Sequence, residues 1–514
     1  MRVEHFLEQG AAARPAKTAL VCDGRRLSYC ELNEEADRFA ALLQDGGVRR
    51  GDRVAIYLDN SSEAVVAIFS ALKAGAAFVM VNPSVKPAKL SFLLNDCRAT
   101  ALVCDHRRLA GLATVCADTH HLLALFVVGL DADHQEIGAS RPKVTPFAKP
   151  MPRAGSRTDG IDIDLAALLY TSGSTGQPKG VMMTHLNMVS AAASITTYLE
   201  NTEADIILNT LPLSFDYGLY QVLLAFRVGA TVVLERSFTY PSAVLATLER
   251  ERVTAFPIVP TIFAILRQLD LSQYDFSSLR YITNTGAAMP VAHVKEMRRL
   301  LPHVAIYLMY GLTECKRVSY LPPDQVEARP DSVGRGMPNE EVYIVDESGT
   351  RLSAGVGELV IRGANVMAGY WERPEETARV LKPGPLPGER VLYSGDLFRV
   401  DGEGYLYFVG RKDDIIKTRG EKVSPREVEN VLHSLEGIAQ AAVVSVPDPV
   451  LGEAIKAVVM LTEDARLTSA DIRRFCARHV EDFMVPTIVE VRTSMPTTPS
   501  GKIDKKLLRA PIAN

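Results

Sequence analysis

Residues 53–81 read RVAIYLDNSSEAVVAIFSALKAGAAFVMV and contain one complete strand–helix–strand pattern. The run RVAIYL predicts a strand, SSEAVVAIFSALKAG a helix and AFVMV a second strand. Lys73 and Gly75 interrupt the apolar stretch between Val65 and Val81, which is too short to span a bilayer. We interpret it as a buried helix that runs into a buried strand.

The same alternation continues on both sides of this stretch. From about residue 15 to 310, apolar runs such as ALVC and TVVL alternate with helix-like segments, which is typical of parallel α/β layering. Residues 330–410 differ, because VYIVD, GELVIRG and GYLYFVG are short strand-like runs joined by the turn sequences DESG and DGEG. We therefore expect a large α/β domain that ends in a β-rich subdomain.

A second domain is predicted after Gly410, where the charged sequence RKDDIIKTRGEK begins. Beyond it, SPREVENVLHSL and SADIRRFCARHV predict helices, and QAAVVSV and AIKAVVML predict strands. The expected organisation is an α/β N-terminal domain at 1–410, a hinge at 411–414 and a small α+β lid domain at 415–514.

Composition narrows the class of protein. The 514 residues are 47% hydrophobic and 23% charged, which fits a globular chain with more than one core. The net charge of −4 favours neither nucleic acid nor an anionic membrane as a partner. Seven scattered cysteines without a CxxC pair suit neither a disulfide framework nor a zinc site, and MRVEHFLEQGAAARP lacks the apolar run of a secretory signal. A cytoplasmic location is expected.

The segment 168–185, LLYTSGSTGQPKGVMMTH, is the first with chemical content. A short strand leads into hydroxyl and glycine residues whose side chains and backbone N–H groups can surround a polyphosphate, while Lys179 adds a positive charge. It is not a Walker motif, because Gly180 stands where Ser or Thr would follow the lysine. We interpret it as a phosphate cradle rather than a Gly/Ser-rich surface loop.

YTSGSTGQPKGV resembles the signature of the adenylate-forming superfamily, which includes acyl-CoA synthetases, adenylation domains and firefly-type luciferases. Three further motifs repeat the resemblance in order: Tyr310 to Glu314 (YGLTE), YSGDLFRVDGEGYLYFVGRKDD at 393–414 and PTTPSGKIDKKLL at 496–508. The resemblance covers nearly the whole chain. It implies ATP, Mg²⁺ and coenzyme A as cofactors and co-substrates, and a small carboxylic acid as substrate.

The resemblance also implies roles for individual residues. Catalysis falls to Lys502, the adenylation lysine, with Thr313 at the AMP phosphate, Glu314 as the magnesium ligand and Lys179 in the cradle. Nucleotide and CoA contacts are implied for Thr171, Ser172, Gly173, Ser174, Thr175, Gly176, Gly286, Ala287, Tyr310, Gly311, Asp396, Arg411 and Lys422. These roles suit the chemistry, since attack of a carboxylate on an anionic α-phosphate needs positioning and charge stabilisation rather than acid–base groups.

The acyl pocket is implied to lie around LPLSFDYGLYQ, FPIVPTIF, TNTGAA and the residues flanking Tyr310. The pocket residues expected are His185, in a packing role, with Asp216, Tyr217, Tyr220, Pro257, Thr285, Met309 and Val318. Most are apolar or small, which indicates a hydrophobic or aromatic acid. Asp216 leaves open an amine-bearing acid, such as an aminobenzoate, or a carboxylate held by backbone N–H groups. The roles of Lys316 and Arg317 stay open.

In the resembling enzymes the small domain rotates between two half-reactions, and Asp413 is the expected hinge. The leading prediction is an acid–CoA ligase. The alternative is a stand-alone adenylation enzyme that loads an acyl or peptidyl carrier protein, and the segment GEKVSPREVE does not separate the two. A luciferase-like oxygenase is a remote third, because the terminus RAPIAN lacks a peroxisomal signal.

Overall fold

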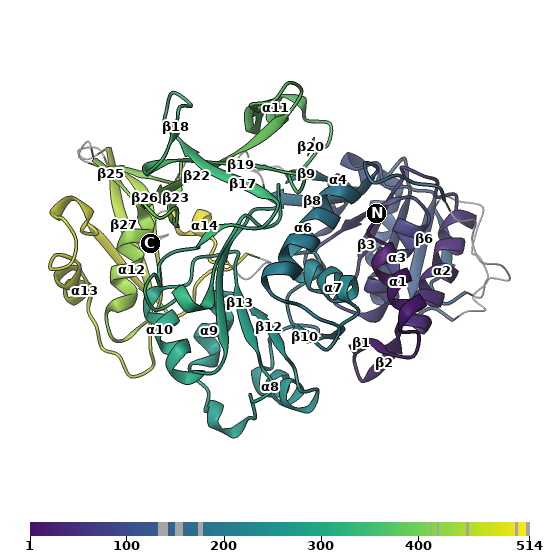
Figure 1. Ribbon diagram of the computed structural model, residues 1–514, viewed down its shortest axis with the longest axis horizontal. Helices are drawn as coiled ribbons and strands as arrows, with labels where there is room; N and C mark the ends of the chain where they lie inside the picture. The colour runs from purple at the N-terminus through teal and green to yellow at the C-terminus, as the bar shows by residue number, and fades with distance from the viewer. Residues whose placement is uncertain are drawn as a thin grey trace.

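The computed structural model describes residues 1–131, 142–149, 158–172, 178–412, 414–418, 421–448, 452–498 and 502–509. The chain as far as Arg411 contains two large sheets and a smaller antiparallel sheet. A fourth sheet lies in the C-terminal part. Figure 1 shows the C-terminal part, in yellow and yellow-green, as a separate lobe beside the rest of the chain. This arrangement confirms the predicted α/β fold with a small C-terminal domain.

The opening stretch of sequence folds as predicted. It forms β3 (Arg53–Tyr57), α3 (Ser62–Lys73) and β4 (Ala77–Met80), and β3 pairs parallel with β4. The Ser61 side chain caps α3 by accepting a hydrogen bond from the Ala64 N–H, and Gly75, with φ of +77°, follows its end. All but two residues of α3 are buried, which explains why its sequence is apolar on every face.

The first sheet has eight strands, most of them parallel. Its order is β20 (Gly369–Tyr370), β9 (Pro178–Thr184), β8 (Leu165–Ser172), β4, β3, β5 (Ala101–Asp105), β6 (Ala124–Val128) and β7 (Lys143–Pro146). The second sheet has nine strands in the order β16 (Arg335–Gly336), β15 (Ser319–Leu321), β14 (Ala305–Tyr310), β13 (Tyr281–Asn284), β12 (Ala255–Ile258), β10 (Ile206–Asn209), β11 (Thr231–Leu234), β1 (Thr18–Cys22) and β2 (Arg25–Ser28).

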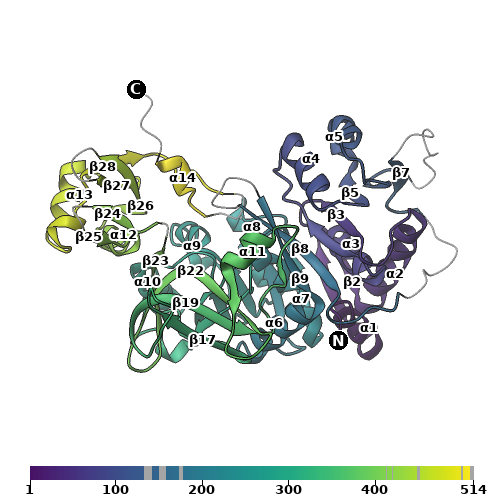
Figure 2. The ribbon, with the colours of Figure 1, turned by 90° about the horizontal axis from the view of Figure 1, so that it is seen from above.

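Helices cover these two sheets (Figure 2). One continuous hydrophobic core joins residues of both sheets. The helices are α1 (His5–Ala13), α2 (Tyr29–Asp45), α4 (Pro87–Asp96), α5 (Ala113–Asp118), α6 (His185–Tyr198), α7 (Asp216–Val228), α8 (Pro241–Arg250), α9 (Pro260–Leu266) and α10 (Val291–Leu300). Within the described part of the chain, no helix combines the length and hydropathy needed to cross a membrane.

The predicted β-rich subdomain is the third sheet. It contains β17 (Glu340–Val345), β18 (Arg351–Leu352), β19 (Gly355–Gly363), β21 (Leu381–Pro383), β22 (Arg390–Val400) and β23 (Leu406–Arg411), with the short helix α11 (Pro374–Val380) beside it. Every pairing in this sheet is antiparallel, as its turn-rich sequence predicts.

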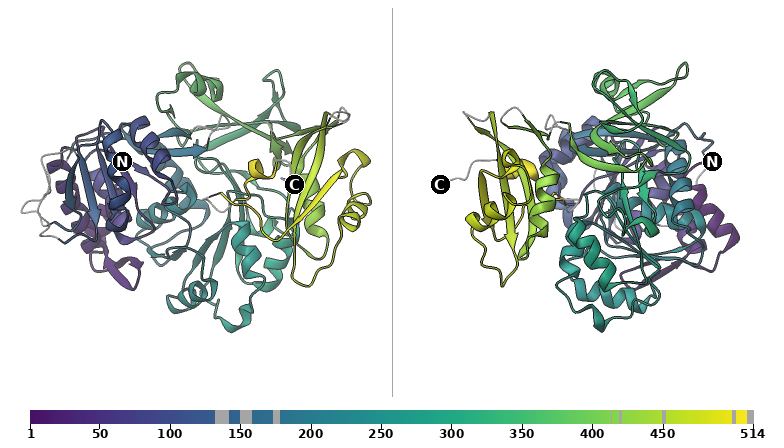
Figure 3. Two further views of the ribbon diagram at one scale, coloured as in Figure 1. Left: turned by 180° about the vertical axis from the view of Figure 1, so that it is seen from behind. Right: turned by 60° about the vertical axis from the view of Figure 1, so that its left-hand side comes forward.

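The C-terminal lobe, which Figure 3 shows from two further sides, has a hydrophobic core of its own. Its sheet contains β24 (Ile416–Thr418), β25 (Glu421–Val423), β26 (Ile438–Asp448), β27 (Gly452–Leu461) and β28 (Ile488–Arg492). The helices are α12 (Pro425–Ser434), α13 (Ser469–Cys476) and α14 (Lys505–Leu508). Both predicted helices and both predicted long strands are present, whereas sequence reasoning missed β24, β25 and β28.

Candidate active site

The hairpin of β8 and β9 presents the two ends of the phosphate cradle. Thr171 lies opposite Lys179 in its register, and the Lys179 Nζ lies 5.3 Å from the centroid of the Tyr370 ring. Four predicted cradle residues lie outside the described residues: Gly173, Ser174, Thr175 and Gly176. The structure therefore describes the strands that hold the cradle, and the roles within it stay predictions.

Glu314 has a partner that sequence reasoning missed. The Tyr370 hydroxyl donates a hydrogen bond of 2.7 Å to Glu314 Oε1, and burial together with the Glu314 charge raises the pKa of that tyrosine. β20, which contains Tyr370, pairs with β9, so Lys179, Tyr370 and Glu314 lie together. Among the described residues there is no cluster of three metal-ligating side chains. One oriented carboxylate beside a phosphate cradle nevertheless fits Mg²⁺, which takes few protein ligands when phosphates supply the rest.

Asp396 is buried, and one of its oxygens accepts no hydrogen bond from any described residue. The Tyr310 hydroxyl donates a hydrogen bond of 2.6 Å to its Oδ2, while Arg411 Nε lies 3.3 Å from Oδ1, which accepts no hydrogen bond. Burial raises the pKa of Asp396, and the Arg411 charge and the Tyr310 hydrogen bond oppose the rise. A buried acceptor without a donor fits a ligand hydroxyl group, as the predicted ribose contact requires.

Lys502 reaches this site from the C-terminal lobe. The Thr498 N–H donates to its carbonyl oxygen at 2.7 Å, and its ammonium group lies 5.6 Å from the centroid of the Phe215 ring. A β-carbon on Gly286, which has φ of +84°, would lie 3.3 Å from Lys502 Cε and 3.1 Å from Phe215 Cζ. Lys502 is half-buried, because its side chain lies against Gly286 and Phe215 of the large domain.

Several charges act on the Lys502 ammonium. Burial lowers its pKa, the nearby carboxylates of Asp216, Asp396 and Glu314 oppose this, and Arg411 adds to it. Among the described residues, the ammonium forms no hydrogen bond or ion pair. Residues from two domains thus surround one position that suits an anion.

The expected acyl pocket contains an internal ion pair. Asp216 is the first residue of α7, and its Oδ2 lies 3.5 Å from Lys316 Nζ. The same Nζ lies 4.5 Å from the centroid of the Tyr220 ring. Burial lowers the pKa of Lys316 to about 7, with the Asp216 charge opposing the shift. The Tyr217 hydroxyl bonds to Thr283, 2.8 Å from its carbonyl oxygen. Asp216 therefore already has a cationic partner within the chain.

Arg317 lies next to this pair and is 1% exposed. Its guanidinium carbon is 5.2 Å from the centroid of the Tyr217 ring, and its Nη1 contacts the sulfur of Met309 and the Tyr198 hydroxyl. Met309 and Val318 are buried as expected of pocket residues. The sequence signal for this site was the pair of basic residues directly after YGLTEC, in a segment that is otherwise apolar.

Several other predicted residues take the following places. Pro257 on β12 lies opposite Thr283 on β13, and Thr285 is buried just after β13. The Ala287 carbonyl oxygen accepts a hydrogen bond from Asn284, and Gly311 is required because a β-carbon there would lie 2.3 Å from the Lys316 carbonyl oxygen. The predicted hinge residue Asp413 and the side chains of Ser172 and Lys422 lie outside the described part.

His185 contacts the N-terminal segment of the chain. Its Nδ1 accepts a hydrogen bond of 3.1 Å from the Val3 N–H and lies 3.5 Å from Glu4 Oε2. Burial lowers its pKa to about 4, so the imidazole is neutral at physiological pH. His185 therefore packs against the N-terminal segment, and its place near the acyl pocket stays a prediction.

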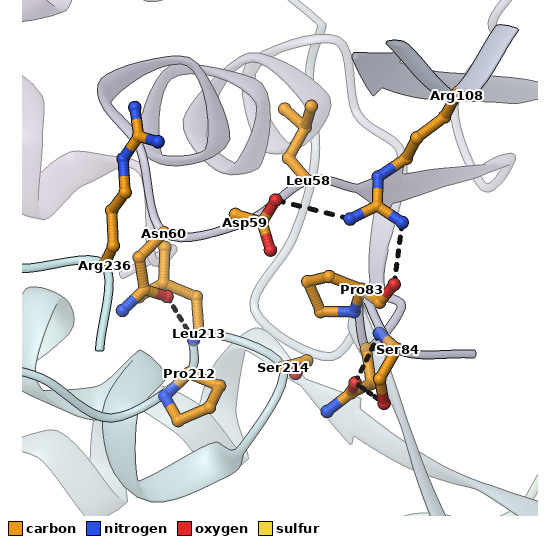
Figure 4. Close-up of a pocket in the computed structure, with 11 residues that line it drawn as sticks. Leu58, Asp59, Asn60, Pro83, Ser84, Arg108, Pro212, Leu213, Ser214 and Arg236 are labelled. Atoms are coloured by element: carbon orange, nitrogen blue, oxygen red, sulfur yellow. Dashed lines mark hydrogen bonds and ion pairs between the residues drawn. The ribbon is translucent and has the colours of Figure 1, made fainter. Parts of the chain in front are cut away.

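A cavity of about 380 Å³ lies beside the candidate active site (Figure 4). Its walls come from the carboxyl ends of strands in both large sheets and include Asn60, Arg108, Ser214 and Arg236. Arg108 donates to the Pro83 carbonyl oxygen at 2.7 Å and lies 3.3 Å from Asp59 Oδ2. Ser214 directly precedes Phe215, whose ring centroid lies 5.6 Å from the Lys502 ammonium. Sequence reasoning missed it because its residues come from distant loops.

Comparison with known proteins agrees with this geometry. The model of the AMP-binding enzyme family matches residues 7–371, and the model of the AMP-binding enzyme C-terminal domain matches residues 427–502. These matches define the class of protein that the cradle and the C-terminal lysine motif indicated. The chain belongs to the AMP-binding enzyme family, and the resemblance to adenylate-forming enzymes is confirmed.

Relatives and a solved structure extend over nearly the whole chain. A long-chain-fatty-acid–CoA ligase of Bacillus subtilis is 30% identical, covering 98% of this chain and 94% of the relative. A feruloyl-CoA synthase of Amycolatopsis is 34% identical, covering 97% and 96%. A plipastatin synthase protein of Bacillus subtilis is 30% identical, with 98% of this chain matching 19% of that protein. The crystal structure of the anthranilate CoA ligase AuaEII with anthranoyl-AMP superposes with a TM-score of 0.88 at 28% identity, covering 99% and 96%.

Proposed function

We propose that this protein is an ATP-dependent carboxylate–CoA ligase that forms an acyl-adenylate and then a thioester, releasing AMP and pyrophosphate. The observation that supports this most strongly is the position of Lys502, whose ammonium comes from the C-terminal lobe into the field of Asp216, Asp396 and Glu314. No described residue pairs with that ammonium. An anionic α-phosphate and an acid carboxylate would supply the missing partners.

In the first half-reaction a carboxylate oxygen bonds to the α-phosphorus of ATP. The bond from that phosphorus to the bridging oxygen breaks, and pyrophosphate leaves with the electron pair. Lys502 stabilises the negative charge that develops on the phosphate, Asp396 orients the ribose and Lys179 holds the outer phosphates. A Mg²⁺ ion bound by Glu314 and the phosphates would neutralise charge on the leaving group.

In the second half-reaction the sulfur of the thiol bonds to the acyl carbon and AMP leaves. We infer that the small domain turns about residues 411–414, with Asp413 as the hinge, and withdraws Lys502 before the thiol attacks. The cavity beside Ser214 offers CoA a route to the acyl carbon, and Arg236 at its wall can attract the CoA phosphates. A cytoplasmic enzyme with magnesium and CoA is the expectation.

The acid proposed is hydrophobic or aromatic in its body, because Tyr217, Tyr220, Met309 and Val318 surround the expected acyl position. The pairing of Asp216 with Lys316 argues against a substrate ammonium, since that cation would compete with one inside the chain.

A mass-spectrometric screen tests the proposed function. The protein is incubated with ATP, Mg²⁺, CoA and a panel of aliphatic, aromatic and amino acids, and AMP, acyl-AMP and acyl-CoA are measured. Acyl-CoA formation for at least one acid supports the proposal, and no AMP with any acid refutes it. Acyl-AMP that passes only to an added phosphopantetheinyl carrier protein would favour the carrier-loading alternative, which the plipastatin synthase relative keeps open.

A further inference from the structure

Arg317 carries a buried charge that no described residue neutralises. Its side chain is 1% exposed and forms no ion pair within the described part of the chain. Its Nη1 is occupied by the Met309 sulfur and the Tyr198 hydroxyl, which lies at 3.5 Å. Nε is buried without an acceptor, and no hydrogen bond joins Nη2 to any described atom. The guanidinium therefore has one edge, formed by Nε and Nη2, without a partner.

The carboxylates nearest in this cluster do not compensate for the charge. Asp216 is paired with Lys316 at 3.5 Å. Glu340 accepts a hydrogen bond of 2.6 Å from the Asn365 amide, which also donates to the Arg317 carbonyl oxygen at 3.3 Å. Burial raises the pKa of Glu340 well above its ordinary value, which favours its uncharged form. Neither Asp216 nor Glu340 forms an ion pair with Arg317.

An unpaired buried charge destabilises a fold, and an opposite charge that enters the site removes that cost. The free edge of a guanidinium matches the two oxygens of a carboxylate, with which arginine forms paired hydrogen bonds. Arg317 also packs on Tyr217, a residue of the expected acyl site, so a ligand group at this edge would be part of the acid substrate.

Resting on the proposed ligase function, we propose that the substrate is a dicarboxylic acid whose second carboxylate binds the free edge of Arg317 while its first is activated beside Lys502. Arg317 is then a specificity-determining residue. The body of the acid lies against Tyr217 and Met309, and Lys316 serves to neutralise Asp216 rather than to bind substrate.

Pairs of acids of equal shape test this proposal on the unmodified protein. A graded series of aliphatic diacids and the isomeric benzenedicarboxylates are each compared with their half-amides, in which the second carboxylate is neutral. The readout is kcat/KM for acid-dependent ATP–pyrophosphate exchange. The best diacid should exceed its half-amide by at least about 100-fold, since a site built for a polar group rejects analogues that lack it.

The variant Arg317→Gln should lose most of the preference for the diacid over its half-amide, and Arg317→Lys should retain part of that preference. Arg227→Gln is the matched control, because Arg227 lies near the far end of α7 and bonds to Thr196. If Arg317→Gln does not fold, the ratio of kcat/KM for a diacid to that for its half-amide, measured on the unmodified protein, still tests the proposal. Equal rates for diacids and half-amides, or a preference that survives Arg317→Gln, would overturn the proposal and leave the ligase function standing. Absence of AMP with every acid would refute both.

Discussion

Replacing Gly286 by alanine tests how closely Lys502 must approach the nucleotide site. The substitution strains the backbone at residue 286 and also crowds two side chains. Gly286 has φ of +84°, a conformation that costs an alanine about 1–2 kcal/mol. The new β-carbon would also lie 3.1 Å from Phe215 Cζ and 3.3 Å from Lys502 Cε, so one of these side chains must move by a few tenths of an ångström.

The expected loss follows from that displacement. Because a misplacement of about 1 Å can cost roughly 100-fold in rate, a shift of a few tenths should lower ATP–pyrophosphate exchange roughly 10-fold. Conversion of supplied acyl-AMP and CoA to acyl-CoA should change less, since Lys502 is proposed to have left the site by then. Both rates are measured with purified protein at saturating substrate.

Gly388→Ala is the control for backbone strain. Gly388 has φ of +78°, and nothing lies within 4 Å of the β-carbon that alanine would add. Both variants should lose similar thermal stability, but only Gly286→Ala should lose adenylation. If Gly286→Ala kept the exchange rate of the unmodified protein, or if Gly388→Ala lost as much activity, the close approach of Lys502 would not matter to the chemistry.

Three further predictions concern separate contacts. Tyr370→Phe should raise the Mg²⁺ concentration needed for half-maximal exchange about 10-fold. The reason is that Glu314 loses a hydrogen bond worth about 1.5–3 kcal/mol. An unchanged Mg²⁺ titration would contradict this prediction. Glu4→Gln should stabilise the protein at pH 8 but not near pH 4.5. Burial raises the pKa of Glu4 from 4.5 to about 7, so between these pH values the folded state holds a proton that the unfolded state has lost. The free energy of unfolding therefore falls by up to about 3 kcal/mol as pH rises through this range. Equal melting-temperature shifts at both pH values would refute the assignment. Arg236→Glu should raise KM for CoA several-fold and leave acyl-AMP formation unchanged, and an unchanged KM for CoA would contradict the cavity as a CoA route.

The fold was predictable where a long apolar run marks a buried element. The run from Val65 to Val81 became a helix buried on nearly every face and the strand that follows it, because such a run is stable only inside a layered core. The short strands β24, β25 and β28 were missed, since segments of three to five residues carry little periodic signal.

The motif residues were predictable one by one, but their partners were not. Tyr370 reaches Glu314 only because β20 pairs with β9, and Lys316 reaches Asp216 across 100 positions of sequence. Such contacts depend on strand order and on a left-handed backbone at Lys316, with φ of +71°. The contact of His185 with Val3 was likewise not predictable, because the two residues are 182 positions apart in the sequence.

The central claim is that Lys502 acts in adenylate formation and in no later step. The direct measurement compares ATP–pyrophosphate exchange with conversion of chemically prepared acyl-AMP to acyl-CoA, for the unmodified protein and for Lys502→Ala. Exchange should fall by roughly 10²- to 10⁴-fold, as expected for loss of a charge that stabilises a transition state, while thioester formation keeps at least about half its rate. Equal losses in the two half-reactions, or an exchange rate that does not change, would contradict the account.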